Sequence, residues 1–299
     1  MFKNLVQKIK AADVVGKFIY ANVIVYVFVL LIGVFSVLFN LGDELNAAVR
    51  LLELPASLHL LLQRPWSIVT YMFLHERFMH ILWNMVALYF FGRIFLNFYS
   101  LRHFVGTYVM GGLLGGITFV LAYNLFPYFA PYVANSFLVG ASASVLAVVV
   151  ASAVRSPGYR IQLFFIGSVK LSTFALVTVG VSVLMLSSDN AGGNFAHLGG
   201  AFAGWLMAYL LNRGKDITDV VNRPIDWVVT FFRNRKYAKK KKGRFTYSPG
   251  GGRSADYEYN ARKKASETEI NKILEKIKAG GYSSLSEEEK KKLFEASSK

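Results

Sequence analysis

The feature that most constrains this chain is a series of six apolar segments, most of them close to the length of a membrane-crossing helix. A helix rises about 1.5 Å per residue, so about 20 apolar residues cross the hydrocarbon core of a bilayer. We therefore predict an all-α membrane protein whose core is a bundle of six transmembrane helices. The predicted spans are residues 18–40, 78–97, 104–123, 142–154, 169–187 and 195–211. The fourth is short, as expected of a span that begins below the bilayer surface.

Charge is distributed unevenly along the chain. The formal net charge is +16, and residues 213–299 contribute +10 of it. A basic chain can bind nucleic acid, but the long apolar segments favour the lipid bilayer as the partner instead. We therefore expect no nucleic acid among its partners. Cysteine is absent, which excludes disulfides, thiolate catalysis and cysteine-ligated metal sites.

The regions between the predicted spans alternate between basic and non-basic. Loops 125–139 and 188–193 contain no Lys or Arg. Basic residues concentrate instead in four other regions, residues 1–17, 93–103, 155–170 and 213–299. Because cytoplasmic loops carry the excess of Lys and Arg, this alternation predicts a multi-pass protein with both termini in the cytoplasm.

Four polar residues lie near the starts of predicted spans two, four and six. They are His80, Asn84, Ser142 and His197. With the N-terminus in the cytoplasm, these three spans all run inward, so the four side chains share a similar depth on the outer side. Polar groups at such depth usually serve a function. Residues of these types can attack an acyl carbon and stabilise an oxyanion.

The spacing within each motif favours one common site. His80 and Asn84 are one helical turn apart and project from the same face. Ser142 lies near a helix N-terminus, where unpaired N–H groups favour an anion. His197 precedes a small-xxx-small face that lets helices pack closely, so it can approach Ser142. No suitably placed Asp or Glu remains in the spans, so we predict a serine–histidine dyad rather than a triad.

In combination the motifs resemble those of the rhomboid intramembrane serine proteases, over roughly residues 15–212. The matching motifs are His80-x-x-x-Asn84, Gly140-x-Ser142 and Ala196-His197-x-x-Gly200-x-x-x-Gly204. The resemblance implies that Ser142 is the nucleophile and His197 the general base and acid. It implies that His80, Asn84 and the backbone N–H of Ser142 stabilise the oxyanion. The expected substrates are transmembrane proteins, cleaved in the bacterial inner membrane without a metal or organic cofactor.

The sequence departs from the rhomboid pattern at several positions. Trp66 resembles the tryptophan of a tryptophan–arginine pair, but the arginine is replaced by Ser67. Ala143 stands where the family often has glycine, and a glutamate often found late in span two is missing. Leu146 stands where a tyrosine often packs on the catalytic imidazole. No reacting group is lost, but another side chain must then position the imidazole.

The polar residues also have structural interpretations. A serine in a membrane helix usually bonds back to its own backbone, and we expect this of Ser144, Ser152, Ser172 and Ser182. The Asn84 side chain could instead form a hydrogen bond that joins two helices. His75, beside Glu76, is expected to be structural or surface-exposed. The overlapping GxxxG pairs at Gly111, Gly112, Gly115 and Gly116 are expected to be packing positions, and they leave the oligomeric state open.

Two other classes of protein fit part of the pattern. The first is a rhomboid-like protein that binds membrane proteins without cutting them, and the presence of both Ser142 and His197 argues against it. The second is a small-solute transporter or channel. The sequence contains no internal repeat and no pair of interrupted helices of the kind that transporters use.

The two ends of the chain are expected to flank an 18–212 catalytic core. Residues 1–17 form an amphipathic cytoplasmic lead. Residues 213–247 form a basic juxtamembrane segment whose aromatic and cationic residues suit an anionic membrane surface, or else a solvated linker. Residues 248–265 are typical of a flexible linker. Capping boxes at 266–269 and 286–289 predict a small helical hairpin over residues 266–299.

Overall fold

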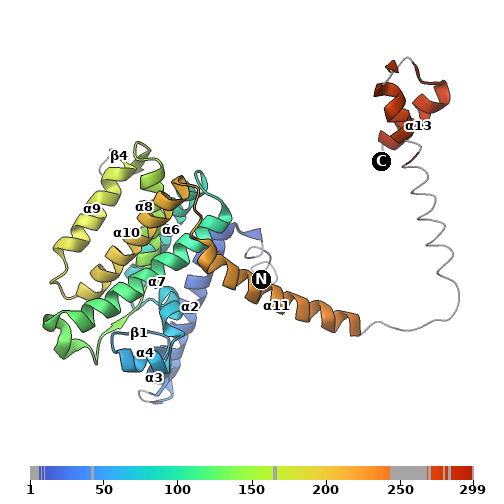
Figure 1. Ribbon diagram of the computed structural model, residues 1–299. Coiled ribbons are helices and arrows are strands. Elements are labelled where there is room, and N and C mark those ends of the chain that lie inside the picture. The colour runs from blue at the N-terminus through green and yellow to red at the C-terminus, as the bar shows by residue number, and fades with distance from the viewer. Residues whose placement is uncertain are drawn as a thin grey trace. The chain divides into compact units, whose positions relative to one another are not determined.

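The structure is a computed structural model of a mostly helical chain (Figure 1). It forms two compact units, Met1–Phe232 and Arg233–Lys299. The residues that the structure describes are 7, 9, 11–41, 44–163, 167–242, 268, 271–278, 280–281 and 284–297.

Six principal helices among the described residues overlap the six predicted spans, with bounds that differ by up to four residues at an end. They are α2 (Val14–Leu38), α6 (Phe78–Leu96), α7 (Leu101–Leu125), α8 (Ser142–Arg155), α9 (Leu171–Leu184) and α10 (Ala191–Asn212). Helices α2, α6 and α7 are long and apolar enough to cross a membrane, and α8 and α9 are shorter apolar helices. The prediction of a mostly helical membrane protein is confirmed, whereas the number of six crossings stays a prediction.

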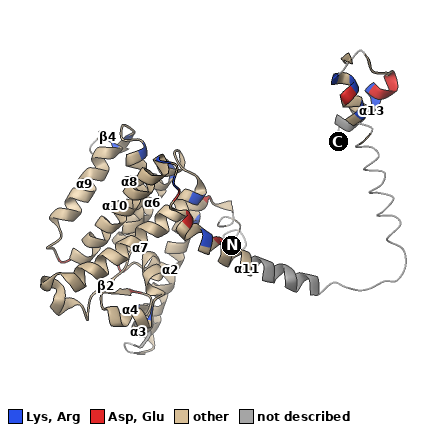
Figure 2. Cartoon of the chain, in the orientation of Figure 1, with Lys and Arg blue, Asp and Glu red and all other residues tan. Residues whose placement is uncertain are grey.

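Contacts between helix ends show which ends lie together. Arg155 at the C-terminus of α8 donates a hydrogen bond to Asn212 at the end of α10, at 3.1 Å. Tyr99, just after α6, donates to the carbonyl of Ala151 at 3.3 Å. Figure 2 shows many of the charged residues of the first unit at this end, around β4 and the start of α11. The N-termini of α6, α8 and α10, which carry the predicted site residues, therefore point to the other end.

Helix α8 is the centre of the bundle, because every residue from 143 to 153 is buried. Helices α7 and α10 pack against it closely at small residues. A Cβ atom on Gly115 of α7 would lie 2.6 Å from the Ala143 side chain. On α10, a Cβ on Gly200 would overlap the backbone of the same Ala143. The predicted small-residue faces are thus confirmed as packing positions, and they set the distance between α8 and α10.

Two short antiparallel strand pairs occur in the connections, for which no strand is predicted from the sequence, and the second pair includes Val169 and Lys170 of the predicted fifth span. Strand β1 (Leu54–Pro55) pairs with β2 (Phe137–Leu138), and β3 (Arg160–Leu163) pairs with β4 (Gly167–Lys170). Other short elements in the connections are α3 (Glu44–Arg50), α4 (Leu58–Gln63), α5 (Ser67–Thr70) and the 3₁₀ turns η1 (Tyr71–Phe73) and η2 (Pro127–Tyr132). The β1–β2 pair matters most for the site, because β2 leads directly into the start of α8.

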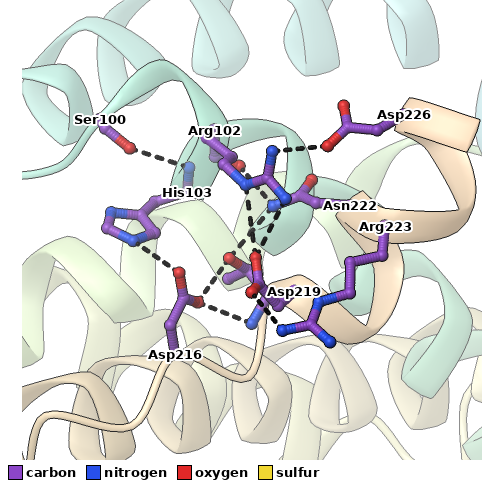
Figure 3. Close-up of polar contacts among 9 residues, drawn as sticks. Ser100, Arg102, His103, Asp216, Asp219, Asn222, Arg223 and Asp226 are labelled. Carbon is purple, nitrogen blue, oxygen red and sulfur yellow. Dashed lines mark hydrogen bonds and ion pairs between the residues drawn. The ribbon is translucent and has the colours of Figure 1, made fainter. Parts of the chain in front are cut away.

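A polar cluster holds the start of α11 (Asp219–Lys242) against the N-terminal turn of α7. Its members are Arg102, His103, Asp216, Asp219, Asn222 and Asp226 (Figure 3). The Arg102 guanidinium contacts the carboxylates of Asp219 at 3.1 Å and Asp226 at 2.5 Å. The Asn222 side chain donates to the carbonyl of Arg102 at 3.1 Å. This α7–α11 polar cluster joins the juxtamembrane segment to the helix bundle.

The predicted helical hairpin over residues 266–299 falls in the second unit, where the described residues include two helical segments. Residues 271–278 are helical, and α13 (Glu287–Ser297) follows. The Ser286 N–H donates to the Glu289 carboxylate at 2.8 Å, and the Glu289 N–H donates to the Ser286 hydroxyl at 3.3 Å. These reciprocal bonds confirm the predicted capping box. Lys276 pairs with Glu289 at 2.9 Å and ties the two helices together.

The first compact unit and the predicted catalytic core end at different residues. The predicted linker at 248–265 lies outside the described residues, as do Ser266 and Glu269 of the first predicted capping box. The first compact unit extends to Phe232, past the predicted end of the core at residue 212. The reason is the α7–α11 polar cluster, whose partners lie more than 100 residues apart in the sequence.

Candidate active site

Ser142 opens α8 immediately after a tight backbone turn. Gly140 has a φ of +124°, a conformation that residues with a side chain rarely adopt. Its N–H donates to the carbonyl of Tyr71 at 3.0 Å. The next N–H, of Ala141, points to Nε2 of the buried His75 at 3.5 Å. These contacts place the Ser142 hydroxyl at a helix N-terminus, where unpaired N–H groups favour negative charge.

His197 of α10 lies opposite this serine. Its Nε2 atom is 2.8 Å from Oγ of Ser142, although 55 residues separate the two in the sequence. Both side chains are half-buried. The close approach of α10 to α8 at Gly200 brings the imidazole within reach. The structure thus brings together the two residues that the sequence analysis predicted to form a pair.

The second nitrogen of this imidazole has a partner that the sequence analysis did not assign. Oγ of Ser182, in α9, lies 3.2 Å from Nδ1 of His197. The same hydroxyl is 3.1 Å from the carbonyl oxygen of Thr178, one turn earlier. We predicted the backbone contact of Ser182 correctly but missed its contact with His197. The sequence did indicate that some other side chain must position the ring, because Leu146 stands where rhomboids often have a tyrosine.

His80 and Asn84 lie one turn apart in α6, as predicted, but their surroundings differ. The His80 ring faces Gly140, where an added Cβ would lie 2.8 Å from Nε2 of His80 and 3.9 Å from Oγ of Ser142. The Asn84 amide is buried and donates to the carbonyl of His80 at 2.9 Å. Of these two predicted oxyanion donors, His80 is beside the turn that carries Ser142, whereas Asn84 is hydrogen-bonded to its own helix.

A cavity of about 760 Å³ opens over the serine–histidine pair. His80, Ser142 and His197 line it together with charged residues that include Arg77 and Asp189. Its size falls within the range that accommodates small ligands and short chain segments. A nucleophile in contact with a base, in a cavity with polar walls, can carry out acyl transfer to water.

Comparison with known families identifies the architecture. The family model for the Rhomboid domain matches residues 62–214, which is more than half of the chain. The chain belongs to the rhomboid family. A second family model, described as a family of unknown function (DUF6576), matches residues 253–299. No curated protein gave a match.

Two departures from the rhomboid pattern have structural counterparts. Space for the side chain of Ala143 is provided by Gly115 of α7, which has no side chain to oppose it. Ser67 is fully buried, and the neighbouring Trp66 donates its indole N–H to the carbonyl of Leu51 at 2.9 Å. The tryptophan of this rhomboid is therefore anchored to the preceding connection without an adjacent arginine.

The other serines follow the structural interpretation only in part. Ser152 donates to the carbonyl of Val148 at 2.8 Å, as predicted. Ser172 donates instead to the carbonyl of Pro157, outside its own helix, at 2.8 Å. Oγ of Ser144 is buried without a hydrogen-bond partner among the described residues.

The described residues contain no group of three or more His, Cys, Asp or Glu side chains that could hold a metal ion.

Proposed function

We propose that this rhomboid is an intramembrane serine endopeptidase that cleaves peptide bonds in or near the transmembrane segments of protein substrates. The observation that carries the proposal is the 2.8 Å contact between Oγ of Ser142 and Nε2 of His197, at the wall of a cavity. A hydroxyl within hydrogen-bond reach of an imidazole is the usual arrangement of an activated serine. A rhomboid-like protein that only binds its partners would not require this pair.

The proposed reaction proceeds in two halves. Oγ of Ser142 attacks the scissile carbonyl carbon while its proton passes to Nε2 of His197, and a tetrahedral oxyanion forms. The C–N bond then breaks, and His197 returns the proton to the departing amine. Water from the cavity attacks the acyl-serine, again losing a proton to His197, and the acid is released with the serine restored.

Oxyanion stabilisation is assigned to the backbone N–H of Ser142, to His80 and to Asn84. The first two are supported by position, because one lies at the α8 N-terminus and the other beside Gly140. Asn84 has a second amide hydrogen beyond the one that it donates to His80. A rotation of this side chain toward the cavity, once substrate is bound, would add a third donor.

In the proposed topology all six principal helices cross a bacterial inner membrane, and both termini lie in the cytoplasm. Helix α8 has 14 residues, and its length of about 21 Å is well short of a hydrocarbon core of about 30 Å. Its N-terminus therefore lies below the outer membrane surface. The cavity over Ser142 would supply the water that hydrolysis needs at this depth.

The juxtamembrane helix α11 is proposed to lie on the anionic cytoplasmic surface of the membrane. Trp227, Val229 and Phe231 are exposed, and the rings of Trp227 and Phe231 stack with their centroids 5.8 Å apart. Four consecutive lysines follow in the sequence at 239–242. Aromatic residues next to cations suit the interface of an anionic membrane. The hairpin beyond it is proposed to regulate or anchor the core without entering its chemistry.

The decisive experiment combines cleavage and labelling. The purified protein in detergent should cut a tethered transmembrane reporter and react with a fluorophosphonate, and Ser142→Ala should do neither. Correct insertion of the variant, checked by its melting temperature, serves as the control. A wild-type protein that retains the reporter uncut, and retains it equally well as Ser142→Ala, would favour the binding protein over the protease.

A further inference from the structure

We propose that Ser182 is a positioning residue for the proposed protease, and that it holds the His197 imidazole in the orientation and tautomer that Ser142 requires. The inference rests on the proposed function. Its basis is the pair of contacts on opposite sides of one ring, 2.8 Å from Nε2 to Ser142 and 3.2 Å from Nδ1 to Ser182.

The hydrogen-bond directions form a consistent chain. For Nε2 of His197 to accept the proton of Ser142, Nε2 must be unprotonated, so the ring hydrogen is on Nδ1. Nδ1–H then donates to Oγ of Ser182. The Ser182 hydroxyl, which still has its own hydrogen, donates to the carbonyl of Thr178 at 3.1 Å. Each hydrogen has one acceptor, and the alternative tautomer would leave Nε2 unable to accept the proton of Ser142.

The position of Ser182 in the fold explains why it is available for this role. Helix α9 is largely exposed, and its buried residues are Leu171, Ala175 and Ser182. These three form the stripe that faces α8 and α10. Ser182 is 3% exposed and lies near the C-terminal end of the helix. Since α9 contributes few other buried groups, its contact with His197 is a specific link between this helix and the dyad.

The same position compensates for Leu146. That side chain is buried in the hydrophobic core one helical turn after Ser142, and it has no group that can form a hydrogen bond to an imidazole. A histidine held only by apolar contacts could rotate about its side-chain torsions. A hydrogen bond at Nδ1 fixes the rotation as well as the tautomer, which is the role of the third member in other hydrolase sites.

Ser182→Ala removes the acceptor and leaves the ring hydrogen of His197 without a partner. We expect kcat on the transmembrane reporter to fall by about 10- to 100-fold, the effect of one unsatisfied buried hydrogen bond. The Michaelis constant should change by less than about twofold, because Ser182 does not line the cavity. Ser182→Thr keeps the hydroxyl and its backbone acceptor, and it should restore most of the lost activity.

The matched control is Ser152→Ala. Ser152 is likewise buried and donates to the carbonyl one turn earlier, at Val148, but it lies in α8 and no contact joins it to His197. A merely structural role for Ser182 would make the two alanine variants equivalent in activity at matched melting temperature. Equal kcat values for the two variants would therefore overturn the proposal.

A second readout does not depend on turnover. In protein with ¹⁵N-labelled histidine, NMR should show His197 protonated at Nδ1, and Ser182→Ala should increase the Nε2-protonated fraction. An unchanged His197 tautomer in Ser182→Ala would overturn the proposal even if activity fell. If the wild type neither cleaves the reporter nor reacts with the fluorophosphonate at Ser142, the proposed protease function is wrong. The tautomer measurement would still show whether Ser182 accepts a hydrogen bond from Nδ1 of His197.

Discussion

Gly204 of α10 lies directly against the backbone of Ala147 in α8. A Cβ atom at position 204 would be 2.8 Å from the carbonyl carbon of Ala147, closer than real Cβ atoms approach a neighbour. One turn earlier, Gly200 meets Ala143 in the same way. These contacts fix the separation of the two helices that carry Ser142 and His197, so the proposed chemistry depends on packing residues outside the Ser142–His197 pair.

Substitution of Gly204 by valine should disrupt this contact. The new side chain would meet backbone, which cannot move aside, so the cost should reach or exceed the range of about 1–3 kcal/mol usual for overpacking. The matched control is Gly33→Val in α2, where no atom lies within 4 Å of an added Cβ. We expect Gly204→Val to lower the melting temperature in detergent and to abolish fluorophosphonate labelling. Wild-type labelling by Gly204→Val would show that the helices do not need this separation.

The dyad predicts a non-additive pair of mutations. Ser142→Ala and His197→Ala should each reduce reporter cleavage to the assay background, and the double variant should be no worse than either. Residues that act as one unit lose function together. Single-turnover cleavage measured for all three variants tests this, and a substantial rate in Ser142→Ala would refute the assignment of the nucleophile.

The assignment of Asn84 to the oxyanion site predicts a partial loss of turnover when its side chain is removed. Loss of one donor among several should lower turnover by about 10²-fold or somewhat less, so Asn84→Ala should fall in this range. It should still insert and still react, more slowly, with a fluorophosphonate. If both rates match the wild type, Asn84 serves only to cap the carbonyl of His80, the contact that the structure contains.

Two truncations test the role of the α7–α11 polar cluster. A chain that ends at Phe232 keeps the contacts of Arg102 with Asp219 and Asp226, whereas one that ends at Asn212 loses them. We expect both to cleave the reporter, because every proposed catalytic residue precedes Arg213. The shorter chain should melt roughly 2–8 °C lower, since each exposed ion pair contributes up to about 1 kcal/mol and the buried Asn222 is lost as well.

The measurement is thermal unfolding of the two truncated proteins in detergent, with reporter cleavage in detergent and in anionic liposomes. Equal melting temperatures would show that the polar cluster contributes nothing to the stability of the bundle. Loss of activity in both truncations, with folding preserved, would contradict the assignment of the C-terminal residues to anchoring and regulation.

The carboxyl of Asp216 predicts that the stability contributed by the α7–α11 polar cluster depends on pH. Burial raises the pKa of its carboxyl, but hydrogen bonds from the Thr218 hydroxyl and N–H, together with His103, outweigh this effect and hold the pKa below its ordinary value of 3.8. A carboxyl whose pKa is lower in the folded state than in the unfolded state stabilises the folded protein at pH values above its unfolded-state pKa. This stabilisation is lost as the pH falls through the folded-state pKa. The wild type should therefore melt higher than Asp216→Asn at pH 7, and the difference should shrink below about pH 4. A difference that stays constant down to pH 3 would contradict this.

The sequence by itself determined the principal helices and singled out Ser142 and His197 as a pair of residues that meet. Apolar runs long enough for a bilayer predict α2, α6 and α7 because helix formation satisfies backbone groups within the segment. The capping box at Ser286 and Glu289 is equally local, with both bonds closing inside one turn. Ser142 and His197 could be paired because their spans run in the same direction and small residues mark the faces that meet.

Only the tertiary structure decided which side chains contact the His197 ring. The contact of Ser182 with His197, the pairing of β1 with β2 and the bond between Asn222 and Arg102 join segments separated by 15 to 120 residues. Sequence patterns record which face of a helix is apolar, but they do not record its rotation against a neighbour. That rotation follows from the simultaneous packing of all the helices, and a change of one residue in register would point the hydroxyl of Ser182 away from the imidazole.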